Sequence, residues 1–64
     1  MFEKLKAEMA KQGISGNRLA MMSFMSPSDF YAAISGKKPF YPAWRKRIAD
    51  ALDADEADIF DDEE

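Results

Sequence analysis

The tetrapeptide Ser26-Pro27-Ser28-Asp29 constrains the fold most strongly, because it marks the start of a helix near the middle of the chain. Ser26 carries a side-chain oxygen suited to an N-cap, and Pro27 fits the first helical position. Asp29 stands three residues after the cap, as in a capping box. The pattern therefore predicts a helix from Pro27. Gly36 is expected to end this helix, because glycine readily adopts the left-handed conformation found there.

Two further helices are predicted before this point. Apolar residues at helical spacing line one face of the first helix: Phe2, Leu5 and Met9. Gly13 is expected to end that helix. A second, short helix is expected over about residues 16–23, with Ser15 as its N-cap. Its apolar face consists of Leu19, Ala20 and Met22.

Two helices are also predicted after it. Residues 37–41 are expected to form an extended loop, because a residue that precedes proline is pushed away from helical dihedrals. Pro42 can open a fourth helix, whose apolar face comprises Trp44, Ile48, Ala51 and Leu52. A fifth helix is expected to begin near Asp55 and to end in two residues that dock on the core, Ile59 and Phe60. The chain is therefore predicted to be all-α, a compact bundle of five short helices.

A chain of 64 residues forms one small domain with a thin margin of stability. We assign this domain to residues 1–60 and expect the four successive carboxylates at 61–64 to form an acidic, disordered tail. The longest unbroken apolar run, residues 30–34, is far shorter than the roughly 20 residues that span a bilayer. The first 13 residues are too charged for a secretory signal. We therefore expect a cytoplasmic protein without membrane contact.

The sequence contains neither cysteine nor histidine. Thiol nucleophiles, Ser-His pairs and most zinc sites are thereby excluded, and we expect no enzyme, cofactor or small-molecule substrate. Four acids have the spacing of calcium-loop ligands: Asp53, Asp55, Asp61 and Glu64. However, Ala57 and Asp58 occupy positions that require an oxygen ligand and a glycine, so no metal site is expected.

Charge is distributed very unevenly along the chain. Residues 1–49 contain all nine basic residues and three acids, a net charge of +6, whereas residues 50–64 contain nine acids and no base. A basic body favours contact with a polyanion, although the net charge of -3 hides this.

The order of these elements resembles the lambda-repressor/Cro-like (XRE) helix-turn-helix family over residues 14–60, about three quarters of the chain. The resemblance rests on Ile14-Ser15, Leu19-Ala20, Met25-Ser26, Phe30, Gly36-Lys37, Pro39-Phe40, Ile48-Ala49, Ala51-Leu52 and Ile59-Phe60. It implies a small DNA-binding transcriptional regulator of phage or mobile-element type. The partner would be double-stranded DNA, with the helix at residues 27–35 in the major groove.

The resemblance also implies a set of contact residues. Family members read bases at four positions, which match Pro27, Ser28, Tyr31 and Ala32 here. Ser28, Tyr31 and Ala32 are the candidates for base contact, because each carries a hydroxyl or a methyl group. Phosphate-binding candidates lie at the start of the second helix and in the loop after the third: Asn17, Arg18, Lys37, Lys38 and Tyr41. Gly16 departs from the family, in which a polar residue often begins the second helix and binds a phosphate. The chain thus has more candidates for phosphate contact than for base recognition.

Other interpretations of these residues stay open. Lys37 and Lys38 can equally belong to a solvated charged surface, and the sequence does not decide between phosphate contact and solvation for residues 45–47. Phe24 replaces the glycine that is common in the turn of the family.

We expect Met22 and Met25 to pack in the core. Met21 and Phe24 either fill gaps or form an apolar surface for a homodimer or a protein partner. The alternative function is therefore a degenerate helix-turn-helix that acts as a protein–protein interaction module.

Overall fold

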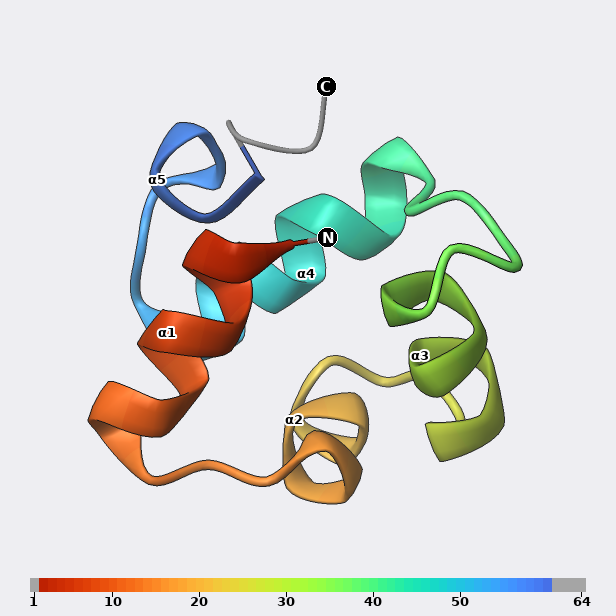
Figure 1. Cartoon of the computed structure of the whole chain (residues 1–64), viewed down its shortest axis with the longest axis horizontal. Coiled ribbons are helices and arrows are strands. Elements are labelled where there is room, and N and C mark those ends of the chain that lie inside the picture. Colours follow the sequence, from red (N-terminus) through yellow and green to blue (C-terminus); the bar gives the residue numbers. More distant parts are fainter. Residues whose placement is uncertain (1, 61–64) are drawn as a thin grey trace.

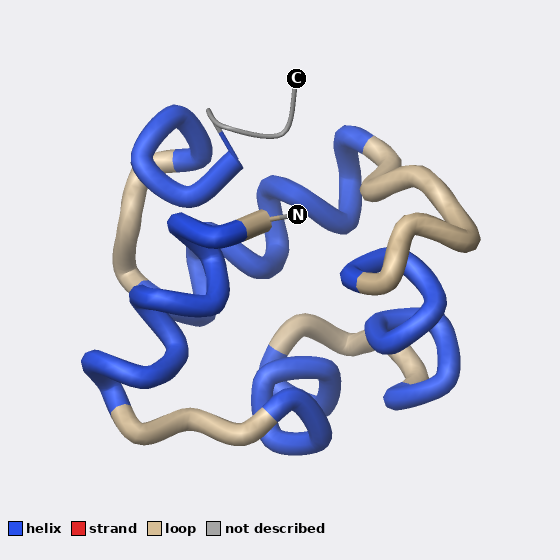
Figure 2. The backbone as a smooth tube through the Cα atoms, viewed as in Figure 1, coloured by secondary structure: helices blue, strands red, loops and turns tan. Residues whose placement is uncertain are grey.

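Five helices connected by short loops build the part of the chain that the computed structural model describes, residues 2–60 (Figure 1). The helices are α1 (Glu3–Gln12), α2 (Gly16–Met22), α3 (Pro27–Ile34), α4 (Pro42–Leu52) and α5 (Glu56–Phe60). These residues contain no strand (Figure 2). The predicted all-α fold with five short helices is confirmed. The acidic tail predicted at 61–64 lies outside the described residues.

The starts of α2 and α3 follow from their capping residues. The Ser15 hydroxyl accepts a hydrogen bond of 3.2 Å from the backbone N–H of Arg18. The Ser26 hydroxyl accepts one of 3.1 Å from the backbone N–H of Asp29, and Pro27 is the first residue of α3. Each cap satisfies a donor that the helix itself leaves unpaired.

The helix ends also agree with the glycine pattern. Gly13 has φ 67° at the end of α1, and Gly36 has φ 87° just after α3. The helix predicted at residues 27–35 is one residue shorter, because Ser35 is its C-cap. Asp53 ends α4 in the same left-handed region with φ 55°. The Gln12 side chain donates a hydrogen bond of 2.8 Å to the Leu52 carbonyl and so ties α1 to the end of α4.

The core is built around an aromatic cluster. Ring centroids of Phe2 and Phe60 lie 4.9 and 5.1 Å from that of Phe40, and the ring of Phe30 lies 6.3 Å from it. These edge-to-face contacts add to the burial of the rings. The buried apolar residues are Phe2, Leu5, Leu19, Ala20, Met25, Phe30, Ala33, Phe40, Ile48, Ala49, Leu52, Ile59 and Phe60.

Figure 1 shows how the helices are arranged around this core. α4 crosses the middle of the molecule and contacts both α2 and α5, while α1 packs on α5 and α2 packs on α3. α1 lies at one side of the view and α3 at the other. The loop from α3 to α4 runs along the outside of the bundle, next to the C-terminal end of α3.

One core prediction was wrong. Met25 is buried, but Met22 is 39% exposed. The buried face of α2 is formed by Gly16, Leu19, Ala20 and the C-cap Ser23. Successive residues of a helix point in directions about 100° apart, so only some positions of α2 face the core and Met22 lies at the edge of the buried face. Within the described residues, the fully buried hydroxyl of Ser23 has no hydrogen-bond partner.

Candidate nucleic-acid interface

The outer face of α3 carries the residues predicted to read bases. Phe30 and Ala33 are buried, so the opposite side of the helix is turned toward solvent. Ser28 and Tyr31 are exposed, and Ala32 is half-buried. The face therefore offers one free hydroxyl, one phenol and one methyl group, which together form a small and mainly neutral surface.

Tyr31 is held at the junction of α2 and α3. A Cβ atom added to Gly16 would lie only 2.6 Å from the Tyr31 hydroxyl oxygen and 2.8 Å from Cζ. Residue 16 must therefore be glycine for the tyrosine ring to keep this position. Glycine at position 16 thus fits the close approach of the Tyr31 ring. The ring also contacts Phe30 edge-to-face at 5.6 Å.

Asn17 and Arg18 follow Gly16 in the first turn of α2, and both are exposed. They line a recess together with Ser15, Met21 and Met22, while the residue before them, Gly16, is approached by the Tyr31 hydroxyl. The structure thus brings the polar beginning of α2 next to the outer face of α3.

On the other flank, Lys38 forms an ion pair with Asp29. The Lys38 ammonium lies 3.0 Å from the Asp29 carboxylate, and both groups are partly exposed. The backbone N–H of Lys38 donates a hydrogen bond of 3.2 Å to the carbonyl of Ala32, so the loop folds back along α3. Lys38 neutralises the only acid in α3. Lys37 is exposed, and within residues 2–60 its ammonium has no ion pair.

The hydrogen bond from the Lys38 ammonium holds the pKa of the Asp29 carboxyl below its ordinary value. The ion pair therefore stabilises the fold above the pKa of an unfolded aspartate, about 3.9, and this contribution disappears as the pH falls through the lower folded pKa. We expect Lys38→Met to raise the pKa of Asp29, measured by NMR titration of its carboxyl carbon. Lys37→Met is the matched control and should leave it unchanged. Identical titrations in all three proteins would contradict the ion pair.

Tyr41, the last of the predicted phosphate contacts, and the nearby Arg45 both pack on aromatic rings. Tyr41 is about half-exposed, and its ring packs edge-to-face on Trp44 at 4.8 Å. Arg45 lies 4.9 Å above the ring of Phe60 and 3.7 Å from the Glu56 carboxylate. It therefore holds α4 to α5, a structural role that the sequence left undecided.

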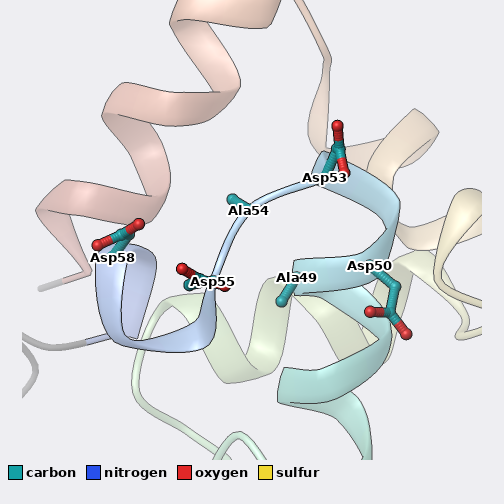
Figure 3. A pocket seen from close by; sticks show the side chains of 6 residues that line it. All are labelled: Ala49, Asp50, Asp53, Ala54, Asp55 and Asp58. Atoms are coloured by element: carbon teal, nitrogen blue, oxygen red, sulfur yellow. The ribbon is translucent and has the colours of Figure 1, made fainter.

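The acids of the C-terminal half surround a separate pocket. Asp50, Asp53, Asp55 and Asp58 line it together with Ala49 and Ala54 (Figure 3). The carboxylates point in different directions and do not converge on one point. Within residues 2–60, no group of three or more acids is placed to hold a metal ion. Four carboxylates give this side of the molecule a negative charge, which is unfavourable for contact with a polyanion.

Comparisons with protein-family models, with curated proteins and with solved structures each gave no match. No helix within residues 2–60 combines the length and the apolar character that a membrane span requires.

Sequence reasoning missed the pairing of Lys38 with Asp29 and the contact between Tyr31 and Gly16. A glycine at the first position of a predicted helix was the one available signal for the second contact. The opposite charges of Asp29 and Lys38 were visible, but the path of the loop between them was not.

Proposed function

We propose that this protein is a small cytoplasmic regulator that binds double-stranded DNA through α2 and α3 as a helix-turn-helix. The proposal rests mainly on one observation, the neutral outer face of α3 between two polar flanks. The four-residue turn from Ser23 to Ser26 also supports it, since two helices joined by such a turn typify the motif. Phe24 has φ 58° in this turn, at the position where the resembled family often has glycine.

In this proposal α3 enters the major groove. Ser28 can hydrogen-bond to several bases, and the Ala32 methyl can contact the methyl group of thymine. Tyr31 is less adaptable because its ring leans on Gly16. So few base contacts give weak sequence discrimination, and most of the affinity would come from phosphates.

Phosphate contacts are proposed on both flanks. Asn17 and Arg18 bind one strand from the start of α2, and Lys37 and Tyr41 bind the other from the loop. Lys38 exchanges its ion pair with Asp29 for a phosphate, or shields Asp29 from the DNA. A Lys38 ammonium that stays close to Asp29 offsets the repulsion that a free carboxylate on α3 would cause.

The test is binding to random-sequence duplex DNA at two salt concentrations. Neutralisation of about three phosphates, by Arg18, Lys37 and Lys38, predicts that affinity falls roughly 40-fold between about 50 and 200 mM salt. Fluorescence anisotropy of a labelled duplex measures this slope. No association at the lower salt concentration would exclude DNA binding.

The alternative function, a protein–protein interaction module, is favoured by a different observation. Met21 and Phe24 are largely exposed at the end of α2, although both are apolar. Protein contact without any affinity for DNA is the result expected from this alternative.

A further inference from the structure

The turn between α2 and α3 exposes an unusual apolar surface. Phe24 is 83% exposed and Met21 is 71% exposed. Phe24 also has φ 58°, a left-handed conformation that is unfavourable for a bulky side chain and easy for glycine. The isolated domain therefore carries a strained aromatic residue whose ring gains little from burial. Contact with another molecule would account for both features.

A groove lies directly beside this ring. Met22, Phe24 and Ala51 provide its apolar lining, and Arg47 and Asp50 complete it. The groove thus runs between the α2–α3 turn and the second half of α4. It combines a protruding aromatic side chain with an apolar recess in one small area.

The two charged residues of the groove, Arg47 and Asp50, form no ion pair within residues 2–60. Arg47 and Asp50 are three residues apart on α4 and so project from neighbouring positions of one face. The Nε atom of Arg47 is buried without a hydrogen-bond partner in the described part of the chain. Over the same residues, the Asp50 carboxylate takes part in no ion pair. A half-buried guanidinium group and an exposed carboxylate of opposite charge therefore lie side by side on this face.

We propose that a second copy of this chain docks on this groove in a two-fold symmetric homodimer. A two-fold axis brings each surface against itself, so the same patch must supply both halves of every contact. This patch can do so, because Arg47 of each copy can pair with Asp50 of the other. Phe24 of each copy fills the recess between Met22 and Ala51 of the other. An unrelated partner would not require this internal complementarity.

The dimer is expected to be weak. Three apolar side chains and two ion pairs form an area at the low end of protein interfaces, below about 1,200 Å² in total. We therefore expect a monomer–dimer equilibrium at micromolar or higher concentrations. The proposal does not depend on DNA binding, and it is tested without DNA.

The first experiment is sedimentation equilibrium of the wild type and of Phe24→Gly. Glycine accepts the left-handed turn, so this variant keeps the fold while it loses the ring. We expect its self-association to weaken at least tenfold. Tyr31→Ser removes another exposed aromatic ring outside the groove and should leave self-association unchanged. A wild type that stays monomeric up to millimolar concentration, or equal association of wild type and Phe24→Gly, overturns the proposal.

The second experiment separates a second copy from any other partner. Arg47→Asp places two acids on one groove, and Asp50→Arg places two bases on the other. Each variant alone should be monomeric, whereas an equimolar mixture should form a heterodimer, because both cross-pairs are then restored. Circular dichroism checks that each variant is folded. Two folded variants that fail to associate when mixed would refute the symmetric pairing of Arg47 with Asp50.

Discussion

Replacement of Phe40 by alanine is expected to unfold most molecules at room temperature. Phe40 is buried and touches rings from the beginning, the middle and the end of the described chain, Phe2, Phe30 and Phe60. Loss of a buried phenylalanine lowers the free energy of unfolding by about 3–5 kcal/mol. A domain of this size rarely has more than about 3–5 kcal/mol of stability in total, so the loss can consume all of it. Circular dichroism at 222 nm would follow the loss of helix.

Tyr41→Ala is the matched control for this prediction. Tyr41 is the next residue along the chain, but it is about half-exposed and contacts only Trp44 among the aromatic rings of residues 2–60. Its replacement should lower the free energy of unfolding by roughly 1 kcal/mol or less. A Phe40→Ala protein that unfolds at the same temperature as Tyr41→Ala would show that the aromatic cluster does not hold the fold together.

The second large effect is expected from reversing the charge at Lys37 and Lys38. In the proposed DNA complex both lysines face phosphates, and Lys38→Glu would also leave Asp29 beside a second carboxylate. We expect the double variant to bind random duplex DNA more weakly by a factor on the order of 10 to 100 at low salt. Anisotropy titrations would also show a smaller dependence of affinity on salt.

Lys6→Glu with Lys11→Glu changes the net charge by the same amount on α1. Figure 1 places α1 on the side of the bundle away from α3. This control should lose much less affinity, since only long-range attraction is altered and salt screens it. Equal losses in both double variants would mean that the overall charge, and not the surface around α3, determines binding.

Local signals in the sequence were sufficient to predict all five helices. Ser15 and Ser26 mark helix starts through hydrogen bonds from residues only three positions away, and Pro27 does so by its fixed φ at the first helical position. Gly13 and Gly36 mark ends through their own backbone conformation. Such signals depend on few neighbours and can therefore be read without knowledge of the fold. The capping serines and the glycines that end helices therefore agree with the helices that the spacing of apolar residues predicts.

Contacts between elements were less predictable. The position of Lys38 beside Asp29 depends on how the loop after α3 turns back, and the fit of Tyr31 over Gly16 depends on how closely α2 and α3 approach. Met22 was assigned to the core because helical spacing alone does not define the edge of a buried face. These contacts depend on how the helices and loops pack against one another, and the local sequence does not specify that packing.

The loop after α3 is held at both of its ends. The backbone N–H groups of Lys37 and Lys38 donate hydrogen bonds to the Ala32 carbonyl, and Phe40 is buried in the core two residues later. The lysine backbone is thus ordered before any ligand arrives. A DNA molecule that binds here would restrict only the side chains, so the loss of conformational entropy on association would be small. A short protein with few base contacts can in this way gain affinity from preorganisation without additional contact area.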